Sequence, residues 1–172
     1  PGVKRDHPDF FPAYVMNYVL GGGGFESRLY EEVREKRGLA YSAYSYLAPL
    51  DHAGIIIGGA GTANARTGET VKVLRDEWAK MNKSGLTQTE LKDAKTYLTG
   101  SYPLRFSSSR RIAGMMTGIQ LEKLGLSYIK KRNSYIEAVS LDDVNRVAAK
   151  LLDPAKITMV IVGQPKGVTS TP

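Results

Sequence analysis

The chain has 172 residues, about the length of one domain, and 42% of them are hydrophobic, enough for one sizeable core. It has no cysteine, which excludes disulfides, thiol catalysis and cysteine-ligated metals but fits both a reducing cytosol and a bacterial periplasm. The net charge of +7 is divided among separate short clusters, and no run approaches the roughly 18 apolar residues of a membrane span. We therefore expect neither nucleic-acid binding nor a membrane segment.

The first expected helix follows a turn-rich start. Asp9 is placed to cap it, and Pro12 lies in its first turn, where a missing N–H costs nothing. Apolar residues from Phe10 to Val19 recur at three- and four-residue spacings, which predicts a broad buried face. Gly21 is expected to end this helix.

A run of four glycines, residues 21–24, separates this helix from a second one. The second helix is expected over about 27–36, with Leu29 and Val33 on its apolar stripe and a stop at Gly38. Each of the glycines accepts conformations that other residues avoid, so the run is either a flexible turn or a close approach by another backbone. A helix N-terminus after glycines also attracts an anion or a peptide carbonyl, although the signature of a phosphate-binding loop is missing.

Two strands are expected next. Residues 41–46 alternate, which places Tyr41, Ala43 and Ser45 on one face, and the isoleucine-rich residues 54–59 return as an antiparallel partner. The rest of the chain is expected to be mainly helical, with a last buried strand over 157–162. The first of these helices is expected over 67–81, with Val71, Leu74, Trp78 and Met81 on its buried face. A second helix is expected to begin at the Thr87–Glu90 capping box and to end at about 104. Three more are expected: one over 111–123, one that is capped by Ser127, and one from Ser140 to about 152.

These elements predict an α+β fold, with helices packed on one face of a mostly antiparallel sheet. We interpret residues 1–163 as a single domain and residues 164–172 as a polar tail. The sheet has few strands, and Pro-Gly is an unusual start, so we expect a fragment of a longer chain whose first strand lies before Pro1.

The available chemistry is limited. The two histidines, His7 and His52, lie in turns and belong to no metal-binding motif, so we predict no metal site in this chain. Arg34 near the helix end and Tyr41 after the Gly38 turn are placed to point into one space, where a guanidinium binds a carbonyl and a phenol stabilises an oxyanion. The alternative is an Arg34–Glu31 surface pair and a half-buried tyrosine, which spacing alone favours.

The stretch LGGGGFESRLYEEVREKRGLAYS closely resembles the second, non-zinc domain of the pitrilysin, insulin-degrading and mitochondrial-processing-peptidase family of zinc proteases, the inverzincins. The element R-x-x-x-G-L-A-Y is its most specific part. The Thr87-x-x-Glu90-Leu91 and Ser140-Leu-Asp-Asp-Val helix starts also match, and the resemblance covers about 9–163.

The resemblance implies half of a clamshell metalloendopeptidase. The other half, a homologous domain or subunit, is expected to carry zinc on an H-x-x-E-H helix, and peptide is the expected substrate. By this resemblance Tyr41 stabilises the oxyanion, Arg34 binds a substrate carbonyl, and Gly22, Gly23 and Gly24 lie at a substrate loop that is shorter here. This chain alone would be inactive and would hold no cofactor. The alternative is a catalytically inactive structural subunit of the same family.

Overall fold

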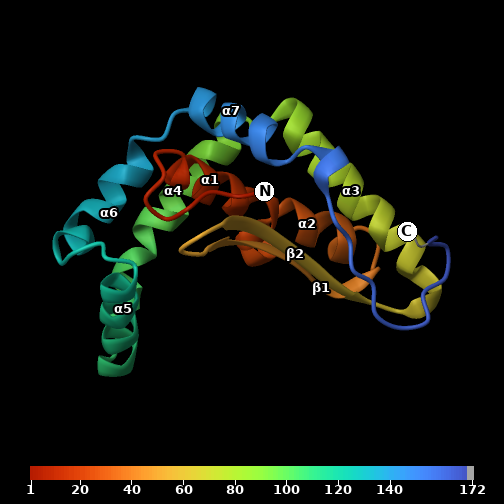
Figure 1. Ribbon diagram of the computed structural model, residues 1–172, viewed down its shortest axis with the longest axis horizontal. Coiled ribbons are helices and arrows are strands. Elements are labelled where there is room, and N and C mark those ends of the chain that lie inside the picture. The colour runs from red at the N-terminus through yellow and green to blue at the C-terminus, as the bar shows by residue number, and fades with distance from the viewer. Residues whose placement is uncertain (170–172) are drawn as a thin grey trace.

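A β-hairpin forms the sheet of the computed structural model, which describes residues 1–169 (Figure 1). Strands β1 (Ala40–Pro49) and β2 (Gly54–Thr62) pair antiparallel, with Pro49 opposite Gly54 at the turn. The pairing is interrupted near the start of β1, because Ala40 faces Thr62 and Ala43 faces Ala60. Two residues of β1 therefore oppose a single residue of β2, which is a β-bulge.

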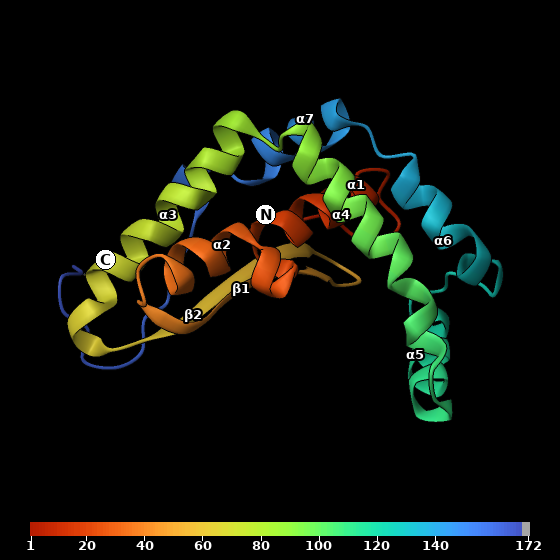
Figure 2. The same ribbon diagram turned by 180° about the vertical axis from the view of Figure 1, so that it is seen from behind.

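Helix α1 (Phe10–Asn17) and the short α2 (Arg28–Tyr30) lie against β1 (Figures 1 and 2). Each of them continues into a wide π-type turn, over Tyr18–Gly22 and Glu31–Glu35. The expected second helix thus exists, as α2 and its wide turn. The expected end of the first helix at Gly21 is wrong, because the helical path continues until the Gly23 N–H bonds the Tyr18 carbonyl at 2.8 Å.

Five longer helices follow. They are α3 (Thr67–Ser84), α4 (Gln88–Gly100), α5 (Ser109–Leu121), α6 (Ser127–Glu137) and α7 (Leu141–Leu151). Both expected capping boxes are present, Thr87 with Glu90 and Ser140 with Asp143, because each needs only local geometry. Helix α6 begins as expected, but Leu126 rather than Ser127 is its cap. Helix α7 packs against α1 and α3, whereas α5 extends away from the rest (Figure 1).

The core lies between the hairpin and these helices. Its largest fully buried apolar side chains are Met16, Leu20, Leu29, Met81, Ile136 and Leu152. Helix α3 turns Val73 and Met81 into this core, while the expected stripe of Val71, Leu74 and Trp78 is only partly buried. Helices cover one face of an antiparallel sheet, so the α+β fold class is confirmed. No helix within residues 1–169 is long and apolar enough to cross a membrane.

The last expected strand is not formed. Residues 157–162 have no strand assignment, and Val160 and Val162 are 84% and 93% exposed. A strand needs a partner for its backbone, and β1 and β2 pair only with each other within the described residues. The following segment is held in place, because the Lys166 N–H donates to the Asn64 carbonyl at 2.9 Å. Part of the expected tail, residues 170–172, lies outside the described residues.

Candidate functional site

The α2 segment is anchored at its N-terminal end by Arg28. The guanidinium donates from Nε to Glu90 Oε1 at 2.7 Å, and from Nη2 to Glu90 Oε2 at 2.8 Å and to the Gly85 carbonyl at 2.9 Å. Burial raises the pKa of Glu90, but the hydrogen bonds from Arg28 and Thr87 outweigh it and hold that pKa below its usual value. A bidentate, largely buried arginine–carboxylate pair fixes both position and direction. It therefore ties α2 to the start of α4.

The C-terminal end of the same segment is shaped by Gly38. Its φ of +56° is the left-handed conformation that glycine adopts without a steric penalty. The Gly38 N–H donates to the Arg34 carbonyl at 2.8 Å, and the Leu39 N–H donates to the Val33 carbonyl at 2.8 Å. These bonds close the helix end and send the chain directly into β1. The turn thereby brings Arg34 and the start of β1 side by side.

Arg34 and Tyr41 are in contact. The guanidinium carbon of Arg34 lies 4.7 Å from the Tyr41 ring centroid and 4.9 Å from the Tyr30 ring centroid. A guanidinium at this distance from aromatic rings is held by cation–π attraction while its N–H groups remain free to bind other groups. The arginine side chain is 33% exposed and Tyr41 is 82% exposed. Both polar groups are accessible to a molecule outside the chain.

The β-bulge decides which way Tyr41 points. Simple alternation would put Tyr41 on the face of Ala43 and Ser45, and that expectation is wrong. Ala43 and Ser45 are buried, but the extra residue before them turns Tyr41 outward. A half-buried tyrosine is therefore not what the structure contains.

The expected alternative for Arg34 also differs from the structure. Glu31 pairs with Lys36 at 2.9 Å rather than with Arg34. The carboxylate beside Arg34 is that of Glu35, whose Oε1 lies 3.8 Å from Nε, too long for a hydrogen bond. Arg34 is held mainly by aromatic rings and only weakly by a carboxylate.

Tyr30 is the residue of this cluster that sequence reasoning missed. Its ring is buried, contacts the Phe25 ring edge-to-face at 4.9 Å, and supports Arg34 from the helix side. Burial raises the pKa of Tyr30 even though the Arg34 charge opposes it. The signal was present in the sequence, because Tyr30 and Arg34 are four residues apart and face the same side of a helical turn.

The glycines form the support next to this cluster. A Cβ on Gly21 would lie 2.5 Å from the Ser45 backbone nitrogen, so the helix turn and β1 approach as closely as only glycine allows. Gly22 and Gly23 are similarly close to Asn17 and Tyr18, whereas Gly24, with φ +61°, has open space around its Cα. Gly24 precedes Phe25, whose side chain is 77% exposed and whose ring contacts the Tyr30 ring.

No group of three or more histidine, cysteine, aspartate or glutamate side chains is arranged to hold a metal ion among residues 1–169. His7 accepts a hydrogen bond at Nδ1 from the Asp9 N–H at 2.9 Å, which closes the turn before α1. His52 is exposed in the hairpin turn. Both histidines thus lie in turns, as the sequence predicts.

A family model described as the peptidase M16 inactive domain matches residues 1–98, more than half of the chain. The chain belongs to this family. The M16 domain is 34% identical over 155 residues to an uncharacterised zinc protease of Streptomyces coelicolor, a match that covers 88% of this chain and 33% of the relative. It is 32% identical over 167 residues to a protein of Helicobacter pylori named a non-peptidase homologue, covering 95% of this chain and 38% of that one.

A crystal structure of a peptidase M16 inactive domain from Pseudomonas fluorescens is 36% identical and superimposes with a TM-score of 0.75. The match covers 90% of this chain and 36% of the Pseudomonas chain. The family resemblance read from the glycine-rich stretch is therefore confirmed. The M16 domain described here spans about a third of the length of the curated relatives that it matches.

Proposed function

We propose that this M16 domain is the substrate-binding half of a zinc-dependent endopeptidase and acts only when it faces a zinc-bearing homologous half. Zinc held by that other half would supply the activated water, and this chain contributes donors from the opposite wall. The observation that carries the proposal is the Arg34–Tyr41 contact, in which both polar groups are accessible and the arginine is pre-positioned by Tyr30. The zinc-protease names of relatives support the reaction class.

The two side chains have different roles in this proposal. The Tyr41 hydroxyl donates a hydrogen bond to the oxyanion that forms when water attacks the scissile carbonyl, so it stabilises the transition state more than the bound peptide. Arg34 offers planar, fixed donors to a neighbouring carbonyl of the peptide, which holds the substrate in register. Of the proposed substrate-loop residues Gly22, Gly23 and Gly24, only Gly24 has open space where a Cβ would lie, so Gly24 is proposed to leave room for the substrate backbone beside Phe25, while Gly22 and Gly23 allow the loop to pack on Asn17 and Tyr18.

The test is peptide cleavage by the assembled enzyme, with this chain combined with its zinc-bearing half. Tyr41→Phe removes one oxygen and is expected to lower kcat by about 100- to 1000-fold, the usual loss for one oxyanion donor. Tyr44→Phe is the matched control, because Tyr44 is an exposed tyrosine of the same strand and is expected to keep the parental rate. A Tyr41→Phe enzyme that cleaves peptide at the parental rate would remove Tyr41 from the mechanism.

Arg34 is tested in the same assembly. Arg34→Ala is expected mainly to raise KM, because the lost interaction is with the bound peptide. Arg34→Lys keeps the charge but loses the planar pair of donors, so it should recover only part of the affinity. Unchanged KM and kcat in Arg34→Ala would exclude a contact between Arg34 and the substrate.

A second candidate function is a catalytically inactive structural subunit. It is favoured by the name of the Helicobacter relative, a non-peptidase homologue that is 32% identical. The two candidates differ in one measurement. An assembled, zinc-loaded complex that forms normally but cleaves no peptide would favour the structural subunit, and cleavage that depends on Tyr41 would exclude it.

A further inference from the structure

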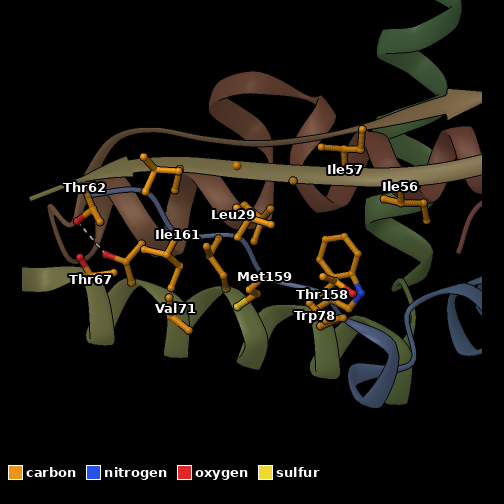
Figure 3. A pocket seen from close by; sticks show the side chains of 18 of the residues that line it. Leu29, Ile56, Ile57, Thr62, Thr67, Val71, Trp78, Thr158, Met159 and Ile161 are labelled. Carbon is orange, nitrogen blue, oxygen red and sulfur yellow. Dashed lines mark hydrogen bonds between the residues drawn. The ribbon is translucent and has the colours of Figure 1, made fainter. Parts of the chain in front are cut away.

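The turn between Arg34 and Tyr41 is held by the β2–α3 connection, residues 62–70. Thr62 ends β2 and lines a cavity of about 550 Å³ that also borders α3 (Figure 3). Its hydroxyl points toward α3, where a dashed line in Figure 3 marks a hydrogen bond. Three successive carbonyl groups of the turn, those of residues 37–39, accept hydrogen bonds from the β2–α3 connection.

Arg66 holds two of these carbonyl groups. Its Nη1 donates to the Gly38 carbonyl at 3.2 Å, and its Nη2 donates to the Arg37 carbonyl at 3.3 Å. Glu69 directs the guanidinium, because its Oε2 accepts hydrogen bonds from Nη2 at 3.0 Å and from Nε at 3.3 Å. The end of a helix leaves carbonyl groups without partners, and a planar guanidinium can bridge two of them at once. Arg66 therefore closes the end of the segment that carries Arg34.

Thr62 holds the third carbonyl group. Its hydroxyl donates to the Leu39 carbonyl at 2.7 Å and can still accept a hydrogen bond at Oγ1. The buried Thr70 hydroxyl, on α3, lies 3.0 Å both from Thr62 Oγ1 and from the Arg66 carbonyl, so α3 supports the two residues together. Thr62 also faces Ala40 in the register, just before the β-bulge. The chain thus enters β1 at a position that the β2–α3 connection fixes.

Tyr41 depends on this backbone support because its side chain has little packing. The residue is 82% exposed, so contacts with the protein interior do not fix the ring. Six residues separate it from Arg34, and the β2–α3 connection holds the carbonyl groups of three of them. A shift of about 1 Å in a reacting group is enough to slow a reaction strongly. The 4.7 Å separation of the Arg34 guanidinium from the Tyr41 ring therefore depends on the β2–α3 connection.

We propose that Arg66 and Thr62 are positioning residues for the Arg34–Tyr41 pair, which act through the carbonyl groups of residues 37–39. They hold the turn and touch neither the substrate nor the reacting carbonyl. When either side chain is lost, the turn relaxes and the Tyr41 hydroxyl no longer lies where the oxyanion forms. This role rests on the proposed function, because the position of the pair matters only if the pair acts on substrate. Its signature is a loss of kcat that requires the Tyr41 hydroxyl.

Peptide cleavage by the assembled enzyme tests the role of Arg66. Arg66→Ala is expected to lower kcat by about tenfold, less than Tyr41→Phe does, because the Leu39 carbonyl is still held. Arg66→Lys keeps a charged donor but loses the planar fork, so it should recover part of the rate. Arg75→Ala is the matched control and should keep the parental kcat, because Arg75 is an exposed arginine of α3 that contacts Met159.

Thr62 gives a more conservative comparison. Thr62→Val replaces the hydroxyl by a methyl group and is expected to lower kcat by about three- to tenfold, the value of one hydrogen bond. Thr62→Ser keeps the hydroxyl and should keep most of the rate. Arg66→Ala is also combined with Tyr41→Phe, where it should lower kcat by less than about twofold, because the donor that it positions is already gone.

Fluorine NMR follows the Tyr41 ring without any need for cleavage. Fluorotyrosine replaces Tyr41 in one sample of the chain and Tyr44 in a control sample. We expect Arg66→Ala and Thr62→Val to shift or broaden the resonance at position 41. The resonance at position 44 should stay unchanged, because Tyr44 lies beyond the β-bulge and pairs with Gly59.

Four results would count against positioning by the β2–α3 connection. A parental kcat in both Arg66→Ala and Thr62→Val, with a slow Tyr41→Phe, would overturn the positioning role and leave the proposed function intact. A parental kcat in Tyr41→Phe would instead overturn the proposed function and, with it, any catalytic role of the connection. An unmoved resonance at position 41 in both variants would overturn the positioning role whatever Tyr41→Phe does. Equal losses of kcat from Arg66→Ala with and without the Tyr41 hydroxyl would show a general structural effect.

Discussion

Replacing Glu90 by glutamine should loosen the anchor of α2 without removing the local cap of α4. The glutamine side chain has nearly the same shape, and glutamine also serves at the third position of a capping box. The substitution removes the negative charge of the carboxylate, whose oxygens accept hydrogen bonds from Arg28 Nε at 2.7 Å and from Arg28 Nη2 at 2.8 Å. The variant thus isolates the charge-assisted pair from the helix cap.

The expected loss follows from the burial of the pair. The Arg28 and Glu90 side chains are only 13% and 29% exposed, so water screens their interaction weakly. Hydrogen bonds to charged groups contribute about 1.5–3 kcal/mol. Arg28 keeps its bond to the Gly85 carbonyl, which limits the damage. We expect the free energy of unfolding at pH 7 to fall by about 2 kcal/mol.

The stability difference between the parent chain and Glu90→Gln should depend on pH. The pKa of Glu90 is lowered in the folded chain, so the native state favours the charged carboxylate. Its contribution is therefore fully present above the unfolded pKa of about 4.3 and is lost as the pH falls through the folded value. The parent chain and Glu90→Gln should differ most at neutral pH, and the difference should shrink as the pH falls below the unfolded pKa and through the folded pKa of Glu90.

Urea unfolding at several pH values measures this difference. Glu122→Gln is the control, because Glu122 is exposed at the end of α5 and its loss is expected to stay within about 0.5 kcal/mol. Equal stability of the parent and Glu90→Gln at pH 7 would refute the anchoring role. A difference that persists unchanged from pH 7 to pH 3 would refute the electrostatic explanation.

Three further predictions follow from other contacts. Gly21→Ala should lower the free energy of unfolding by about 1–3 kcal/mol in a urea titration, because its Cβ would lie 2.5 Å from the backbone of β1. Asp9→Asn should destabilise the chain by about 1–2 kcal/mol at neutral pH, because it breaks the 2.8 Å ion pair with Arg146 that joins the start of α1 to α7. The hydrogen bond from Arg146 holds the pKa of Asp9 low, so the difference in stability between the parent chain and Asp9→Asn should disappear in acid. Tyr30→Leu should lower kcat/KM of the assembled enzyme by about two- to fivefold, the value of one cation–π contact to Arg34, whereas Tyr30→Phe should retain it.

Local signals in the sequence were reliable where the physics is local. The Thr87 and Ser140 capping boxes form as predicted, since each uses a side chain and a backbone N–H only three residues apart. Gly38 ends the second helix as expected, and the structure shows that it does so in the left-handed conformation. The prediction that Gly21 ends the first helix failed. Glycine is needed at this position because the backbone of β1, far along the chain, lies too close for a Cβ, and not because a helix ends there.

The strands show the same limit more strongly. Residues 157–162 have the composition of a buried strand, but a strand exists only with a partner, and the described chain provides none. Alternation predicted the wrong direction for Tyr41, because a bulge inserts one residue and reverses the pattern. The four-residue spacing of Tyr30 and Arg34 was visible in the sequence, but only the structure shows that the Tyr30 ring lies against the Arg34 guanidinium.

The sequence by itself determined the α+β class, the two capping-box helix starts at Thr87 and Ser140 and, through the R-x-x-x-G-L-A-Y element, the family and the pair to test. It did so because capping, turn chemistry and a family motif are written in neighbouring residues. The tertiary structure alone decided that Arg34 lies between Tyr30 and Tyr41, that Tyr41 points outward, and that a cavity lies beside β2. These features depend on contacts between distant segments, which periodicity and spacing do not record.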